Sequence, residues 1–162
     1  AQFLEDIVLV VMPFALILAV AGSTTRNPMS VGQIGMLEAD RSVHGIVHVT
    51  RHPINWGIAM WAGAHMLANG DVPSLIFFGA LAFLAMVGSW QIDLKRKREK
   101  PYQWAQFSAQ TSFVPLAALI GRRARVSLGE IGWIRIVAAL ALYAILLGVH
   151  PWLFGESVIP GQ

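Results

Sequence analysis

Long runs of apolar residues, separated by basic loops, constrain this chain more than any other feature of its sequence. Hydrophobic residues make up 56% of the chain and charged residues only 13%, whereas soluble domains carry about 25% charged residues. The mean hydropathy is +0.58. This composition indicates an integral membrane protein, and a length of 162 residues is enough for a single domain.

Five apolar segments organise the chain. A membrane-spanning helix needs about 20 apolar residues, and four of the segments reach or approach this length with their flanks. The four are residues 7–21, 54–68, 72–92 and 131–154, and the fifth, residues 112–120, is too short to span. We therefore expect an all-α fold: a polytopic membrane helical bundle of about four transmembrane helices plus a short re-entrant or interfacial segment.

The second and third segments are separated only by Asn69, Gly70 and Asp71, a tight turn that predicts a helical hairpin. Pro53 precedes the second segment, and proline is favoured in the first turn of a helix. If the short segment does not cross, all 12 lysines and arginines fall on one side of the membrane. The opposite side receives the acidic residues Glu5, Asp6, Asp71 and Glu156.

This charge asymmetry predicts the orientation of the chain. Loops rich in lysine and arginine stay on the cytoplasmic side. We therefore expect a multi-pass protein of the bacterial cytoplasmic (inner) membrane with its basic loops in the cytoplasm. The asymmetry also accounts for the pI of about 9.8 without nucleic acid as a partner.

Histidines are the main candidates for chemistry, because the absence of cysteine excludes thiol nucleophiles and cysteine-bound metal sites. His44, His48 and His52 are spaced four residues apart and would share one face of a helix near the basic side. In that geometry His44 and His48 could also hold a metal. His65 follows His52 by 13 residues, which is roughly 20 Å of helix rise. His65 and His150 should therefore form a second layer, at the opposite side of the membrane.

His65 lies among the small residues Ala62, Gly63 and Ala64, which suit close approach of another helix or of a flat cofactor. An ionisable group inside a membrane needs a partner. Three interpretations remain open: an axial haem ligand, a proton carrier, or a histidine bonded to a backbone carbonyl or water.

Several motifs resemble the NnrU family, whose superfamily includes the 15-cis-zeta-carotene isomerases. The likeness begins at "STTRNP", is strongest at "VTRHPINWGIAMWAGAHMLANGD", continues through "SLIFFGALAFLAMVGSWQID" and "TSFVPLAALIGR", and ends in "EIGWIRIVAALALYAILLGVHPWLFG". It covers roughly residues 22–155. The motif residues are Arg51, His52, Pro53, Gly57, Asn69 and Asp71.

The resemblance implies a multi-span membrane protein with haem b as its cofactor. In the isomerase two histidines hold the haem iron, and the downstream one corresponds to His65 here. The other lies in an earlier helix, yet this chain has no histidine before His44. We therefore expect residues 1–162 to form a single NnrU-like transmembrane domain that lacks upstream N-terminal helices, unless His150 or another subunit supplies the ligand. The candidate cofactor-binding residues are His65, as iron ligand, with His150 and His52.

Two functions follow from the NnrU resemblance, and a competing resemblance gives a third. The first is a subunit or accessory factor of a respiratory, denitrification or photosynthetic membrane complex. The second is a haem-dependent cis–trans isomerase acting on a carotenoid or another hydrophobic ligand in the bilayer. The third is a membrane methyltransferase, because such enzymes also carry an R-H-P-x-x-x-G motif that helps to bind S-adenosylmethionine. They have an acidic residue on a downstream helix, and Asp93 and Glu99 in the basic run fit that role poorly.

Overall fold

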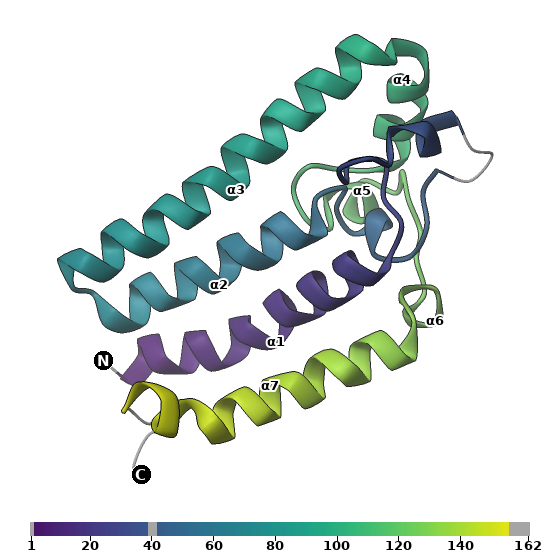
Figure 1. The fold of residues 1–162 in the computed structure, drawn as a ribbon. Coiled ribbons are helices and arrows are strands. Elements are labelled where there is room, and N and C mark those ends of the chain that lie inside the picture. Colours follow the sequence, from purple (N-terminus) through teal and green to yellow (C-terminus); the bar gives the residue numbers. More distant parts are fainter. Residues whose placement is uncertain (1, 39–41, 156–162) are drawn as a thin grey trace.

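A single row of long helices forms the body of the protein (Figure 1). The computed structural model describes residues 2–38 and 42–155, with side chains from Asp6 onward, and this part of the chain contains helices and turns but no strand. Neighbouring helices run antiparallel in the order α3, α2, α1, α7. Their bounds are α1 Gln2–Thr24, α2 Pro53–Asn69, α3 Val72–Glu99 and α7 Trp133–Phe154. The predicted all-α fold is confirmed.

These helices have the length and composition of membrane spans. In the described residues α1 (from Asp6), α3 and α7 are long and apolar enough to cross a membrane. Only 6% of the apolar stretch of α7 is buried inside the molecule, and apolar surface of this extent is stable in lipid rather than in water. Helix α2 has 17 residues, about 26 Å, and lies between α1 and α3. Three helices of the described chain thus qualify as spans and α2 is shorter, so the predicted count of four is approximate.

The predicted turn between α2 and α3 is confirmed. Helix α2 ends at Gly70, which has a φ of +67° and donates its N–H to the carbonyl of Met66 at 3.2 Å. This left-handed conformation favours glycine. Asp71 then caps α3 by accepting a hydrogen bond from the Ser74 N–H at 2.9 Å, and hydrogen bonds from Ser74 lower the pKa of the Asp71 carboxyl. The motif residues Asn69 and Asp71 therefore serve to reverse the chain.

Close packing of α1 against α2 explains another motif residue, Gly57. A Cβ atom at this position would lie 2.8 Å from the carbonyl oxygen of Ala15 and 3.1 Å from the backbone nitrogen of Ala19. Gly22 of α1 makes the reciprocal approach, since its Cβ would lie 2.9 Å from side-chain atoms of Pro53 and Ile54. Small residues let membrane helices approach this closely and gain dispersion energy.

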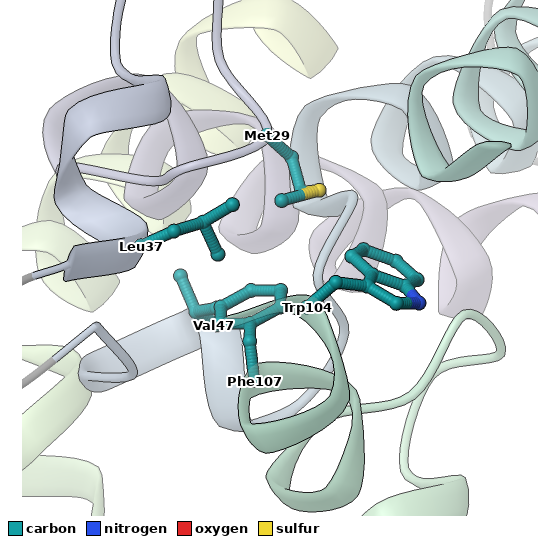
Figure 2. Packing of buried hydrophobic residues seen from close by; sticks show 5 residues of the cluster. All are labelled: Met29, Leu37, Val47, Trp104 and Phe107. Carbon is teal, nitrogen blue, oxygen red and sulfur yellow. The ribbon is translucent and has the colours of Figure 1, made fainter. Parts of the chain in front are cut away.

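The large buried side chains gather at one end of the row, in a region that we call the basic-end cap. It comprises residues 25–38, 42–52 and 100–132, and contains the short helices η1 (Ile34–Glu38), η2 (Gly45–His48), α4 (Pro101–Gln110), α5 (Ala117–Ile120) and α6 (Leu128–Ile131). One apolar cluster, shown in Figure 2, joins its loops to α4 and consists of Met29, Leu37, Val47, Trp104 and Phe107. A second cluster, Leu18, Ala21, Ile46 and Ile131, joins the cap to α1.

All described lysines and arginines lie in the cap or at the cap ends of α3 and α7. Arg41 and Glu156 lie outside the described residues. The short apolar segment belongs to the cap as well, and only Ala117–Ile120 of it is helical. The N–H of Leu116 bonds to the carbonyl of Val49 at 2.8 Å, so this segment folds back on the residues before α2.

The prediction that His44, His48 and His52 share one helical face is wrong. Gly45 has a φ of +57°, a left-handed conformation that interrupts any helix beginning at His44. His48 ends the short helix η2, and His52 is the N-cap of α2. His44 and His48 therefore flank the same short helix, η2, and His52 belongs to the start of α2, so the three do not lie on one helix.

Candidate functional site

The R-H-P motif meets an acidic residue of α3 at the edge of the basic-end cap. Nε and Nη2 of Arg51 lie 2.8 Å and 2.7 Å from Oδ2 of Asp93. Nε2 of His52 donates to the other carboxylate oxygen, Oδ1, at 2.7 Å. The His52 side chain is only 2% exposed, and those of Asp93 and Arg51 are 10% and 13% exposed. Both carboxylate oxygens are thus engaged, and we call these three residues the motif triad.

Backbone contacts fix the position of the motif triad. The Arg51 N–H bonds to the carbonyl of Ser112 at 3.0 Å, and the Arg51 carbonyl accepts the side-chain amide of Asn27 at 2.9 Å. The fully buried Thr50 donates its hydroxyl to the carbonyl of Phe113 at 2.7 Å. These bonds hold the chain ahead of Pro53 in place, which explains why the segment before α2 is ordered without being helical.

Aromatic rings close the motif triad on the side of the cap. The Arg51 guanidinium lies over the Trp104 ring, 5.2 Å from its centroid, and 6.0 Å from that of Phe113. The His52 ring lies 5.4 Å from the Phe113 centroid. Guanidinium groups are attracted to aromatic faces in this geometry. The arrangement therefore joins α2, α3, α4 and the short segment at one point.

A second polar contact joins α2 and α3 one turn deeper. Asn55 donates from its side-chain amide to the hydroxyl of Ser89 at 2.7 Å, and Ser89 donates to the carbonyl of Ala85 at 2.7 Å. Ser89 is fully buried. Hydrogen bonds of this kind hold membrane helices together, so the motif triad and this pair fix the register of α2 on α3.

His65 lies near the other end of α2, as the sequence predicts. Its Nδ1 is 2.9 Å from the carbonyl oxygen of Trp61. Because a carbonyl only accepts hydrogen bonds, Nδ1 carries the proton, and Nε2 of the neutral ring keeps its lone pair. The rings of Trp61 and Phe78 each lie 5.0 Å from the His65 ring by centroid distance. A half-buried imidazole nitrogen in an aromatic setting is a suitable ligand for a metal centre.

The three histidines predicted to contact a cofactor are not brought together. His52 and His65 lie at opposite ends of α2. His150 lies on α7, beside the Phe154 ring at 4.8 Å between centroids, and α1 separates α7 from α2. Among the described residues no group of three or more His, Asp or Glu side chains is placed to hold a metal ion. The pair His44 and His48 is therefore not part of such a group.

The sequence of this chain matches a protein family over almost its whole length. A model of the family described as NnrU protein matches residues 1–158. The chain belongs to the NnrU family. Neither the curated proteins nor the solved structures gave a match to it. Each motif residue of this NnrU family member has a structural role. Arg51 and His52 belong to the motif triad. Pro53 begins α2 and Gly57 packs it against α1, whereas Asn69 and Asp71 lie at the α2–α3 turn.

Asp93 is the member of the motif triad that sequence analysis does not place with Arg51 and His52. Its sequence neighbours place it with Glu99 in the basic run, but the structure makes it the shared partner of Arg51 and His52. A signal is available, because Asp93 is the only acidic residue of α3 before Glu99. A carboxylate at the end of a membrane helix needs a cation, and the helix paired with α3 begins directly after the Arg51–His52 pair.

Among the candidate histidines, His65 has the ring contact that a residue holding a haem iron would need. Haem-binding histidines commonly donate their second ring N–H to a backbone carbonyl, which fixes the ring and leaves the other nitrogen for the metal. The Nδ1 contact of His65 with Trp61 is of this type. Trp61 and Phe78 would pack near a porphyrin, and Gly63 leaves open space beside the helix.

Proposed function

We propose that this NnrU family member is a haem b-associated protein of the bacterial cytoplasmic membrane. In this proposal it serves as a subunit or accessory factor of a respiratory, denitrification or photosynthetic complex, with the basic-end cap in the cytoplasm. The observation that carries the proposal is the His65 ring, whose Nδ1 is held by the Trp61 carbonyl at 2.9 Å. Its Nε2 would be the iron ligand, and haem so bound would supply electron transfer or gas binding.

The helices that pack on α2 favour the role of a subunit, because they supply no second histidine for a haem beside His65. Helices α1 and α3 pack on α2, and neither contains a histidine. An imidazole opposite His65 would then come from a partner protein or from a second copy. The outward apolar surfaces of α3 and α7 offer room for such a neighbour, because most of each helix is exposed. Membrane helices associate through surfaces of this kind.

The same observation supports one alternative. If His65 alone held the haem, the haem would supply the chemistry for cis–trans isomerisation of a carotenoid-like polyene from the bilayer. Methyl transfer receives less support, because Arg51 and His52 are already engaged by Asp93 within the motif triad. These side chains would have to exchange partners before contacting S-adenosylmethionine.

Absorption spectroscopy of the natural protein, purified from its own membrane, tests the haem proposal. We expect the Soret and α bands of haem b, and we expect His65→Ala to abolish them. His44→Ala is the matched control, since His44 lies in the cap, and its spectrum should be unchanged. Folding of each variant is checked by circular dichroism. Purified protein without haem, or a His65→Ala variant with a normal spectrum, would refute the proposal.

A third variant identifies the other axial ligand. If His150 of a second copy completes the coordination, His150→Ala should convert a low-spin spectrum into a high-spin one. An unchanged spectrum assigns the second position to a partner protein or to a substrate. Isomerisation of zeta-carotene by the reconstituted protein then separates the enzyme from the subunit.

A further inference from the structure

A hollow lies where the loop after α1 meets the cap end of α3. Its volume is about 530 Å³, within the range of small-molecule sites. One wall is apolar and consists of Met29, Val31, Ile34 and Ile92. Val31 is 96% exposed, so its side chain is available to contact the apolar part of a ligand. The hollow is distinct from both the motif triad and His65.

Hydrogen bonds fix the loop that forms this wall. Arg96, which is buried, donates from Nε to the carbonyl of Pro28 at 3.1 Å and from Nη2 to that of Ser30 at 3.3 Å. Within the loop, the Asn27 N–H bonds to the side-chain oxygen of Gln33 at 2.9 Å. The hollow is therefore preformed, and a ligand would not have to order the loop when it binds.

The opposite wall carries more positive than negative charge. Lys95, Arg96 and Lys100 line it together with a single acid, Glu99. Nζ of Lys95 is 3.8 Å from the Glu99 carboxylate, and its side chain is 62% exposed, so this pair is weak. Lys100 contacts Glu38 outside the hollow. Lys95 is thus the cation that is most readily available to an anionic ligand.

The hollow lies at the level of lipid headgroups. The apolar part of α3 runs from Val72 to Ile92, 21 residues or about 32 Å, which matches the hydrocarbon core. Ile92 therefore lies at the edge of the hydrocarbon region, and Lys95 one turn beyond it. A ligand with an apolar part against Ile92 and a negative charge beside Lys95 would match both walls.

We propose that this hollow binds an anionic phospholipid. Its phosphate would contact Lys95, and its glycerol and first acyl carbons would cover Ile92 and Val31. The acyl chains would then continue along the exposed surface of α3 into the bilayer. This proposal is independent of haem, because no residue of the hollow contacts His65 or its aromatic neighbours.

Native mass spectrometry of the purified protein in detergent tests this site. Phosphatidylglycerol is titrated as the anionic lipid, phosphatidylcholine as the zwitterionic one, and inorganic phosphate as a competitor. We expect phosphatidylglycerol to bind at least about fivefold more tightly than phosphatidylcholine, since one cation near the membrane surface contributes about this factor. We expect inorganic phosphate not to displace it, because phosphate cannot cover the apolar wall.

Four variants locate the lipid. Lys95→Gln should weaken phosphatidylglycerol binding about fivefold, Val31→Gln should weaken it as well, and Glu99→Gln should strengthen it. Lys97→Gln is the control, because Lys97 is an exposed lysine of the same helix that does not line the hollow. If Lys97→Gln weakened binding as much as Lys95→Gln, the attraction would be diffuse and the site refuted. Equal binding of both lipids, or displacement by phosphate, would refute it too.

Discussion

Asp93 is the residue on which the motif triad depends. Its carboxylate accepts hydrogen bonds from Arg51 and His52, whose positions the backbone contacts of the cap determine. A buried charge that loses its partner is costly, because the desolvation of the remaining group is no longer offset. Arg51 and His52 of the R-H-P motif therefore depend on a carboxylate about 40 positions away in the sequence.

Asp93→Asn should destabilise the fold by about 3–5 kcal/mol, because it leaves the Arg51 guanidinium buried without a counter-charge. Thermal unfolding in detergent, followed by circular dichroism, measures the loss. Glu38→Gln in the cap is the control and should change stability by less than about 1 kcal/mol, since its ion pair with Lys100 is largely exposed. Unaltered stability of Asp93→Asn would show that the motif triad does not hold α2 to α3.

At the scale of elements, small residues decide how closely the helices pack. Gly57 faces the backbone of α1, with no room for a Cβ. Gly63, nearly two turns further along α2, faces open space, because no atom of a neighbouring element lies within 4 Å of the point that a Cβ would occupy. Two glycines of one helix thus have opposite environments. The sequence alone does not distinguish them.

Gly57→Ala and Gly63→Ala should therefore change stability in opposite directions. The first forces α1 and α2 apart and should cost about 1–3 kcal/mol, as overpacking does. The second adds a better helix former in open space and should stabilise by up to about 1 kcal/mol. Thermal unfolding of both variants under identical conditions is the measurement. A Gly57→Ala variant as stable as the unaltered protein would contradict the close α1–α2 contact.

For the whole molecule, the large buried side chains lie in the cap and not between the long helices. Phe107, Ile46 and Val47 are fully buried there, whereas the row of long helices buries mainly alanine and glycine against its neighbours. The cap is the one region of the described chain with a packed core like that of a soluble domain. The described basic residues lie in it or at its edge, so charge and core mark the same side of the membrane.

The absence of cysteine from the chain allows the orientation to be measured directly. Lys97→Cys, at the cap end of α3, should react with a membrane-impermeant maleimide only from the cytoplasmic side. Ala68→Cys, exposed at the far end of α2, should react only from the opposite side. The positive-inside rule gives this expectation. Labelling of both positions from one side would show that α2 and α3 do not separate them across the membrane.

The sequence by itself determined the helices, the α2–α3 turn and the separation of His52 from His65, because these depend on local properties: apolar length, helix rise and turn residues. The sequence did not determine which residues of distant segments contact each other. If α2 and α3 paired symmetrically about Gly70, His52 would lie opposite about residue 88. The observed partner of His52 is Asp93, roughly one turn further along α3.

Only the tertiary structure decided which residues form a site. The register of α2 on α3 comes from contacts such as that of Asn55 with Ser89, and the cap brings Arg51 against Trp104. The order of the helices places α1 between His65 and His150. These relations depend on packing between segments far apart in the chain, and no local pattern in the sequence encodes them.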